Sequence, residues 1–318
     1  ALGVLTEYEP DRLVAVRYAS PLIIGIGKGE NFIGSDIPAI LEHTREVYIL
    51  EDGEMAVLTK NSVEVMTIEG QPVAKDVFHV DWDLMTAEKA GYEHFMLKEI
   101  HEQPKAYRDT MGSRISPDGR RVVLPELKLT PDDIRAIRRI HVVACGTALH
   151  AGLVGKHVIE RLARIPVEAD VASEYRYRNP IITPDTLVIV VSQSGETADT
   201  LAALREAKRA GARVLAITNV VGSSVAREAD DVIITWAGPE IAVASTKAYT
   251  TQLIAFYLFG LYLAQTLGTK DGAFIASVIA AMKELPAQVE DILGHAGVLK
   301  QIAESLARHG NLFFIGRG

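Results

Sequence analysis

A six-residue segment rich in hydroxyl side chains is the strongest candidate for chemistry in this sequence. The segment Ser192-Gln193-Ser194-Gly195-Glu196-Thr197 follows the apolar run 187–191 and precedes a helical pattern over 197–210. A turn that leads from a buried strand into a helix leaves the first backbone N–H groups of the helix unpaired and carries a partial positive charge. Such a turn binds anions, and its hydroxyl and amide side chains add donors. The sequence therefore predicts that Ser192, Gln193, Ser194 and Thr197 bind a phosphate monoester without help from Lys or Arg.

This segment has two other possible interpretations, helix capping and a nucleophile elbow. Ser and Thr residues at such positions often only cap a helix, but three hydroxyls with Gly and Gln in six residues exceed what a cap requires. A nucleophile elbow needs Gly-x-Ser-x-Gly, whereas Ser192 and Glu196 flank Ser194 at the two glycine positions. Phosphate binding remains the favoured interpretation.

Two more segments are expected to face the same crevice. Cys145, Gly146 and Thr147 form a second strand-to-helix turn, and the loop 238–247 contains Val243 and Ser245. Cys145 is a potential nucleophile, but a lone cysteine is more often an inert small residue, so we expect it to line the pocket. Ser245 has simple helix capping as an equal alternative.

Two features nearer the amino terminus suggest sites. Gly25, Gly27 and Gly29 surround Lys28, but their spacing matches neither nucleotide-binding glycine motif, so a tight turn is predicted. Asp36 follows a Gly-Ser pair. Its alternatives are an amino-group ligand and a helix N-cap, and from its position alone the cap is favoured.

The elements that must position these residues alternate regularly along the chain after Thr130-Pro131-Asp132-Asp133, a helix-start signal. Strands are predicted at 140–144, 167–171, 187–191, 213–218 and 231–235, with helices at about 148–163, 197–210, 222–228, 246–267, 271–293 and 297–309. Continuous apolar strands separated by helices imply a parallel sheet that is covered on both faces. A flavodoxin-like doubly wound α/β fold is the simplest arrangement.

The chain before residue 130 has a different character. Short β-branched runs such as 13–16, 22–26 and 46–50, separated by turn signals at 51–54 and 69–72, predict a β-rich layer of hairpins. A linker is expected to follow, with a helical pattern over 90–103 and breaks at Pro104 and Pro125. Residues 311–318 repeat the strand-then-glycine pattern of 140–146, as if a second α/β unit began there.

Composition limits the class of protein. The chain has 318 residues, is 48% hydrophobic and 23% charged, and carries a net charge of -8, which makes binding to nucleic acid or an anionic membrane an unlikely main role. The single cysteine, Cys145, rules out an intrachain disulfide and leaves the cytoplasm as the default location. The longest apolar run, Ile254 to Ala264, is shorter than the roughly 20 residues that span a bilayer, so a buried helix is predicted.

Three motifs in order resemble one enzyme family. They are 144–147, 192–201 and 243–248, accompanied upstream by Gly29-Glu30-Asn31-Phe32-Ile33-Gly34-Ser35-Asp36 and Lys98-Glu99-Ile100-His101-Glu102-Gln103-Pro104. Together they resemble the glucosamine-6-phosphate synthases, the isomerising glutamine:fructose-6-phosphate amidotransferases, over essentially the whole chain. This resemblance implies the carboxyl-terminal part of an amino-terminal-nucleophile glutaminase domain at 1–80, a linker and interdomain helix at 81–130, a first sugar isomerase (SIS) domain at 131–300 and the start of a second at 301–318.

The resemblance also implies roles for individual residues. Ser192, Gln193, Ser194 and Thr197 would hold the phosphate of fructose 6-phosphate or glucosamine 6-phosphate. The sugar would be lined by Cys145, Gly146, Thr147, Val243 and Ser245. Asp36 would bind the amino group of glutamine in a complete glutaminase domain. A homodimer is expected, with no cofactor, metal, nucleic acid or membrane.

Some departures from the family limit what the chain should do. The catalytic cysteine of the glutaminase would lie upstream of Ala1, and the ring-opening and proton-transfer residues beyond Gly318, so no catalytic residue is expected within the chain and it should bind without turnover. Ala148 stands where the family often has a phosphate-binding serine. The alternatives are a non-catalytic sugar-phosphate sensor, which the β-rich upstream segment disfavours, and a related SIS deglycase or isomerase.

Overall fold

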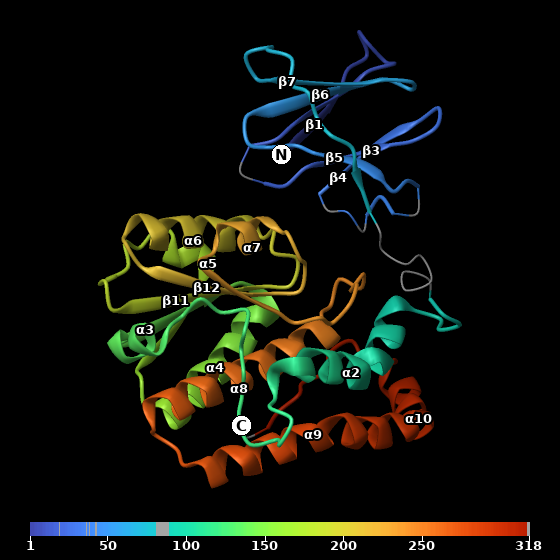
Figure 1. Ribbon diagram of the computed structural model, residues 1–318. Helices are drawn as coiled ribbons and strands as arrows, with labels where there is room; N and C mark the ends of the chain where they lie inside the picture. Colours follow the sequence, from blue (N-terminus) through green and yellow to red (C-terminus); the bar gives the residue numbers. More distant parts are fainter. Residues whose placement is uncertain (19, 36, 38, 42, 81–88, 317–318) are drawn as a thin grey trace.

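The structure is a computed structural model that describes the chain except residues 19, 36, 38, 42, 81–88 and 317–318. Figure 1 shows a β-rich amino-terminal part and a larger α/β part, which are separated in the sequence by the undescribed residues 81–88. The β-rich amino-terminal part and the α/β part of the predicted fold class are thereby confirmed, while the domain boundaries stay a prediction.

The amino-terminal part consists of two four-stranded antiparallel sheets, ordered β1-β2-β6-β7 and β4-β3-β5-β8. Their strands are β1 (Leu2–Leu5), β2 (Leu13–Val16), β3 (Ile23–Ile26), β4 (Asn31–Gly34), β5 (Glu46–Ile49), β6 (Glu54–Leu58), β7 (Val63–Thr67) and β8 (Phe78–His79). A buried cluster joins the sheets, with Ala15 and Ala56 from one and Ile24 from the other. Gly27 and Gly29 lie with Lys28 in the β3–β4 hairpin loop, where Gly29 has φ +76°, so the predicted tight turn is confirmed there. Gly25 lies within β3, where it pairs with Phe32.

The α/β part is built on a five-stranded parallel sheet with the order β10-β9-β11-β12-β13. The strands are β9 (Arg139–Ala144), β10 (Val167–Val171), β11 (Thr186–Ser192), β12 (Arg213–Thr218) and β13 (Asp231–Ile234). Counted in chain order, this is 2-1-3-4-5, the flavodoxin-like arrangement. The predicted fold class and all five predicted strands are confirmed.

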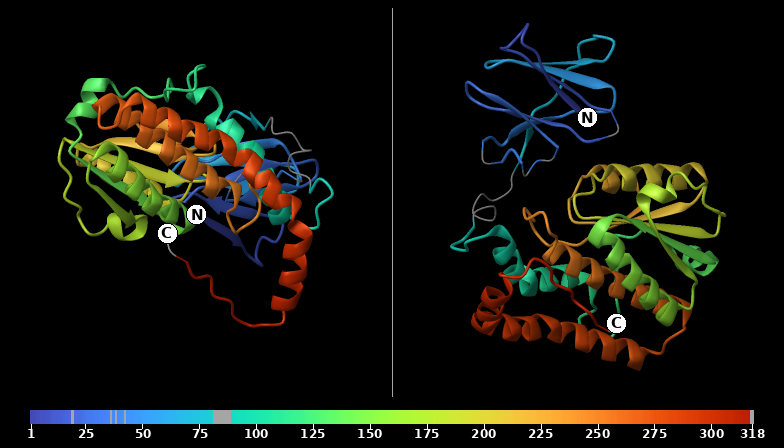
Figure 2. Two further views of the ribbon diagram at one scale, coloured as in Figure 1. Left: turned by 90° about the horizontal axis from the view of Figure 1, so that it is seen from below. Right: turned by 180° about the vertical axis from the view of Figure 1, so that it is seen from behind.

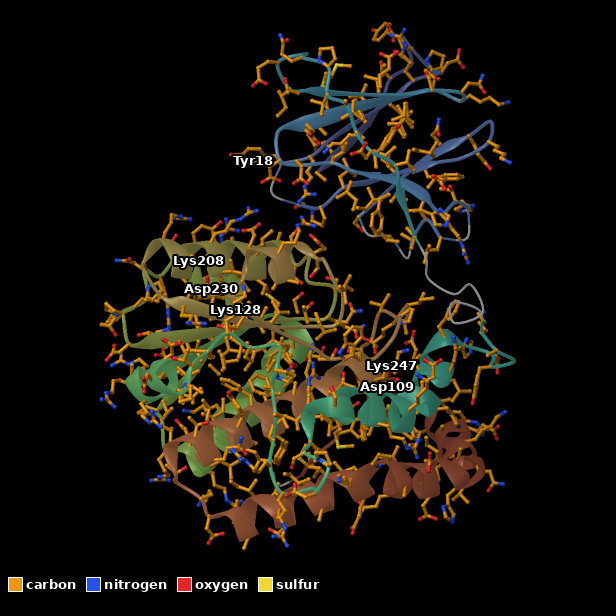
Figure 3. All side chains as sticks on the ribbon, viewed as in Figure 1. Tyr18, Asp109, Lys128, Lys208, Asp230 and Lys247 are labelled. Carbon is orange, nitrogen blue, oxygen red and sulfur yellow. The ribbon has the colours of Figure 1, made fainter. Side chains whose placement is uncertain are left out.

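Helices cover both faces of this sheet (Figures 1 and 2). The α/β helices are α3 (Pro131–Ala136), α4 (Gly146–Ala163), α5 (Ala172–Tyr175), α6 (Ala198–Arg209), α7 (Ser224–Glu228), α8 (Lys247–Leu267), α9 (Gly272–Gly294) and α10 (Ala296–Leu306). Alternate residues of each strand point to opposite faces. On β11, Ile189 packs in the cluster with α4 and α8, whereas Val190 packs with α6. An ion pair also fixes α6, because Lys208 Nζ lies 2.8 Å from Asp230 Oδ1 beside β13 (Figure 3).

Helix α2 (Phe95–Met111) differs from the prediction, because it begins five residues later than Ala90 and continues past Pro104. A proline inside a helix removes one backbone donor and frees the carbonyl four residues earlier. Here the freed carbonyl of Ile100 accepts a hydrogen bond of 3.0 Å from Nε2 of Gln103. The side chain next to the proline therefore replaces the missing donor, and the predicted break at Pro104 was wrong. A short 3₁₀ turn, η1 (Gly112–Arg114), follows.

The carboxyl-terminal segment also differs from the prediction. Residues 311–316 form no strand within the described chain, since an isolated strand needs a neighbour to pair its backbone. The buried run 254–264 lies within α8, as predicted. Among the described residues, no helix is long and apolar enough to cross a bilayer.

Candidate functional site

The site lies where the strand order of the sheet reverses. Helices leave β9 and β11 toward opposite faces, and ligands of doubly wound folds bind in the crevice between such strands, beyond their carboxyl ends. Cys145 directly follows β9, and Ser192 is the last residue of β11. The topology therefore brings the two predicted strand-to-helix turns together.

The turn after β11 is held in shape by its own hydroxyls. Ser192 Oγ accepts a hydrogen bond of 3.0 Å from the Gly195 backbone N–H and lies 2.9 Å from Thr197 Oγ1. Ser194 Oγ accepts a bond of 3.2 Å from the Glu196 N–H. These contacts preorganise the turn before any ligand arrives.

Gly195 is required in this turn by its conformation and by its neighbours. Its φ is +67°, and a Cβ atom would lie 2.0 Å from Ser223 Oγ and 2.5 Å from Ser223 Cβ. The start of α7 is so close because it is hydrogen-bonded to the turn. The Val225 N–H donates to the Gly195 carbonyl at 3.0 Å, and the Ser224 N–H donates to Glu196 Oε1 at 2.7 Å.

The geometry does not support simple capping for this turn. Thr197 occupies the N-cap position of α6, but its side chain makes no capping hydrogen bond, because its hydroxyl is paired with Ser192 instead. The first N–H groups of α6 thus keep no side-chain acceptor from their N-cap residue. That is the state expected of a helix end that receives an external anion.

Glu240 organises the third wall of the site. Its carboxylate accepts bonds from Ser245 Oγ at 2.9 Å, from the Thr246 N–H at 2.8 Å and from the Ala248 N–H at 3.1 Å. Glu240 therefore caps α8 from outside the helix, and Ser245 does not act as the cap. The negative charge is favourably placed at a helix amino terminus.

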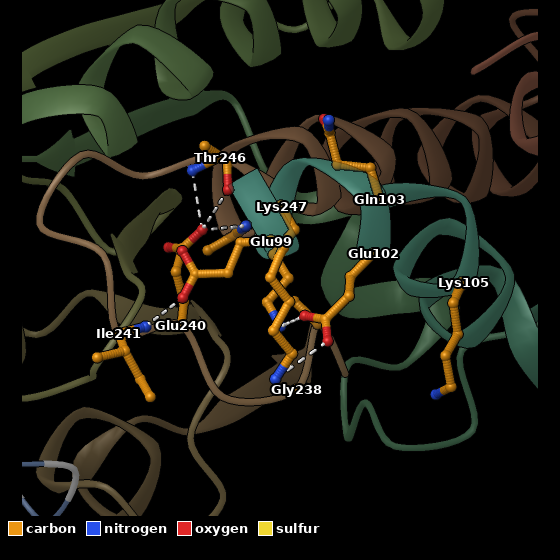
Figure 4. Close-up of polar contacts among 12 residues, drawn as sticks. Glu99, Glu102, Gln103, Lys105, Gly238, Glu240, Ile241, Thr246 and Lys247 are labelled. Atoms are coloured by element: carbon orange, nitrogen blue, oxygen red, sulfur yellow. Dashed lines mark hydrogen bonds and ion pairs between the residues drawn. The ribbon is translucent and has the colours of Figure 1, made fainter. Parts of the chain in front are cut away.

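A buried charged network on α2 supports this wall from behind (Figure 4). Glu99 Oε1 accepts hydrogen bonds from the N–H groups of Ile241 at 2.6 Å and Ala242 at 3.2 Å. Lys247 is 1% exposed, and its Nζ lies 2.5 Å from Glu102 Oε2. Burial raises the pKa of Glu99, and the bonds from Ile241 and Ala242 only partly offset it.

Together these elements enclose a cavity of about 200 Å³. Eight of the nine predicted substrate-binding residues line it: Cys145, Thr147, Ser192, Gln193, Ser194, Thr197, Val243 and Ser245. The ninth, Gly146, opens α4 at φ +57° and is not part of the lining. Asp36, the predicted glutamine-binding residue, lies outside the described residues. The roles of all these residues stay predictions.

Five further residues complete the lining: Ala148, Val191, Glu240, Ala242 and Gln252. Sequence reasoning missed Glu240 and Gln252, although Glu240 stands in the loop that was singled out. None of the described lining residues is Lys, Arg or His, so the positive potential comes from the amino termini of α4 and α6.

A second group of titratable residues lies outside this cavity. His141 on β9 is 2% exposed, and its Nδ1 lies 3.0 Å from the Tyr175 hydroxyl. Burial lowers the pKa of His141, while Glu168 opposes the shift. We therefore expect a neutral imidazole in the folded protein at neutral pH.

Comparisons with known proteins agree with this architecture. A family model described as the SIS domain matches residues 133–262. The glutamine–fructose-6-phosphate aminotransferase [isomerizing] of Clostridium acetobutylicum is 58% identical over 318 residues, which is 100% of this chain and 52% of that protein. The enzyme of the same name from Methanosarcina acetivorans is 48% identical over 317 residues, 100% of this chain and 51% of that protein. The chain thus spans about half the length of these relatives.

A solved structure is also similar to this chain. The C-terminal domain of glucosamine-fructose-6-phosphate aminotransferase from Francisella tularensis superposes with a TM-score of 0.65 at 40% identity. The match covers 69% of this chain and 61% of that one.

Proposed function

We propose, from the premise that this chain is homologous to about half of a glutamine–fructose-6-phosphate aminotransferase and contains its SIS domain, that it forms the fructose 6-phosphate site of such an enzyme. The whole enzyme would convert fructose 6-phosphate and glutamine into glucosamine 6-phosphate and glutamate. One observation carries the proposal: a single cavity at the strand-order reversal gathers Ser192, Ser194 and Thr197 with two helix amino termini.

The phosphate is assigned to the turn after β11. Its hydroxyls and the uncapped N–H groups of α6 are donors, and a phosphate offers only acceptors when it is a dianion. The sugar then extends toward Cys145, Thr147 and Val243, where the lining is less polar. Glu240 and Ser245 keep that wall in place through their mutual hydrogen bond.

We propose further that this chain binds its ligand without converting it. The described lining residues include two titratable side chains, Cys145 and Glu240. Glu240 already accepts bonds from Ser245, Thr246 and Ala248, so its carboxylate is poorly placed to move protons of a sugar. A homodimer and a cytoplasmic location are part of the same proposal, because the sequence resembles a dimeric family and has a single cysteine.

Calorimetric titration of the chain with fructose 6-phosphate, fructose and inorganic phosphate tests the site. Binding of fructose 6-phosphate but not of fructose is expected, and equal affinity for both would refute the assignment. Ser194→Ala should weaken fructose 6-phosphate binding by about 1.5 to 3 kcal/mol, the range for one hydrogen bond to a charged group. Ser277→Ala is the matched control, because that exposed hydroxyl bonds only to the carbonyl of Phe274 on α9.

A further inference from the structure

Gln252 is a buried amide that lines the cavity from α8, whereas the residues predicted to bind phosphate lie in the turn after β11. It is 2% exposed and belongs to the lining. Its Oε1 has no hydrogen-bond partner among the described residues. Buried side-chain oxygens are nearly always paired, so an unpaired one needs an explanation.

The neighbours of Gln252 show that the helix can satisfy its own polar side chains. The Thr251 hydroxyl donates to the carbonyls of Lys247 at 2.9 Å and Ala248 at 3.0 Å. Farther along the same helix, Gln265 pairs both amide atoms with the backbone of Val122, at 3.1 Å and 2.6 Å. The lack of a hydrogen-bond partner for the Gln252 oxygen is therefore not a general property of polar side chains on α8 and depends on where this residue lies.

That position is the cavity. Six other buried side-chain atoms have no hydrogen-bond partner in the described part of the chain, on Arg45, Glu99, His141, Asp170, Glu196 and Thr200, and the Asp170 oxygen among them still lies 3.0 Å from Arg178 Nε in an ion pair. None of those residues lines the cavity, whereas Gln252 does. A buried acceptor without a hydrogen-bond partner on the wall of a pocket suits a ligand that brings a donor.

We infer that Gln252 binds a hydroxyl group of the sugar, and thereby selects a polyhydroxylated phosphate ester over one with an apolar body. The inference rests on the proposed function. A phosphate dianion offers no donor for Oε1, whereas each sugar hydroxyl both donates and accepts. The amide presents a donor beside its acceptor, so either of its atoms pairs with a hydroxyl.

Gln252→Met and Gln265→Met test this inference as a matched pair in the full chain. Gln252→Met keeps the length of the side chain and removes its polar atoms. It should weaken fructose 6-phosphate binding on the order of tenfold, as for one neutral hydrogen bond, and leave inorganic phosphate binding unchanged. Because an unpaired oxygen is removed, the melting temperature of the ligand-free protein should not fall. Gln265→Met should do the reverse, lowering the melting temperature without changing either affinity.

Unchanged affinity of Gln252→Met for fructose 6-phosphate would overturn the inference. So would equal losses for fructose 6-phosphate and inorganic phosphate, which would indicate a structural role. If the methionine variant does not fold, Gln252→Asn keeps the amide but withdraws it by one methylene group, and the same selective loss is expected. Failure of the wild-type chain to prefer fructose 6-phosphate over fructose is a separate result that would refute the proposed function itself.

Discussion

Replacing Gly195 by alanine should disturb the turn 192–197, where we propose that phosphate binds, more than any other single methyl group added there. An L-residue with a side chain pays about 1 to 2 kcal/mol for a left-handed conformation, and Gly195 has φ +67°. The new Cβ would also lie 2.0 Å from Ser223 Oγ and 2.5 Å from Ser223 Cβ. Rotation of the serine hydroxyl relieves only the first contact, so the backbone of the turn or of α7 must shift.

The steric part can be separated from the conformational part with a control glycine. Gly211 follows α6 with φ +86°, and a Cβ there would meet nothing within 4 Å. The strain in Gly211→Ala is partly offset by the lower entropy of the unfolded chain, which contributes about 0.4 to 1 kcal/mol. We expect Gly211→Ala to lower the free energy of unfolding by about 1 kcal/mol on this balance. Gly195→Ala should lower it by about 2 to 4 kcal/mol, because overpacking adds about 1 to 3 kcal/mol.

Urea denaturation of both variants, followed by titration with fructose 6-phosphate, provides the measurement. Gly195→Ala should bind fructose 6-phosphate at least tenfold more weakly, because the hydroxyl and N–H groups of the turn 192–197 are displaced. Gly211→Ala should bind it like the wild type. If Gly195→Ala is no less stable than Gly211→Ala and binds normally, the close contact between the turn and Ser223 is wrong.

Three further predictions concern titratable side chains that are wholly or partly buried. Burial raises the pKa of Glu99, so the folded protein disfavours its ionised form. The free energy of unfolding of the wild type, relative to that of Glu99→Gln, should therefore fall as the pH rises through that pKa. Urea denaturation of both proteins at pH 5 and pH 8 measures this. Burial lowers the pKa of His141, so its contribution to the free energy of unfolding should be lost as the pH falls below about 6.5. His141→Asn should therefore reduce the difference in stability between pH 8 and pH 5. An unchanged difference would count against the buried neutral imidazole. Lys247→Met should cost less than the roughly 3 to 5 kcal/mol of a fully buried pair, because the Glu102 side chain is 26% exposed and keeps Lys98 Nζ at 3.5 Å; Lys247→Met with Glu102→Met should recover part of that loss in a double-mutant cycle.

The parallel sheet and the two strand-to-helix turns could be predicted because their signals are local. Continuous apolar runs such as 187–191 specify buried strands, and the residues just after them must lie at one edge of the sheet. Cys145 and Ser192 thus came together on topology alone. The same local reasoning identified the glycine hairpin around Lys28.

Contacts between distant segments could not be predicted in this way. Glu99 meets Ile241 across 142 positions of sequence, and nothing in either segment signals the other. In the sequence, Gln252 is one polar residue in a helical segment, and only the structure shows that it lines the cavity. The predicted helix break at Pro104 was wrong for a related reason. The rule considers only the backbone donor that proline lacks, whereas the Gln103 side chain donates to the freed Ile100 carbonyl instead.

The absence of Lys and Arg from the described lining of the cavity has a consequence for how the site responds to solution conditions. Its donors are backbone amides, hydroxyls and glutamine side-chain amides, which neither titrate near neutral pH nor carry the net charges that salt screens most strongly. Below pH 7, binding should therefore follow the ligand's own second ionisation, near pH 6, and it should weaken only slightly with ionic strength. If the proposed ligand is correct, a site of this kind responds to the protonation state of the sugar phosphate more than to its own.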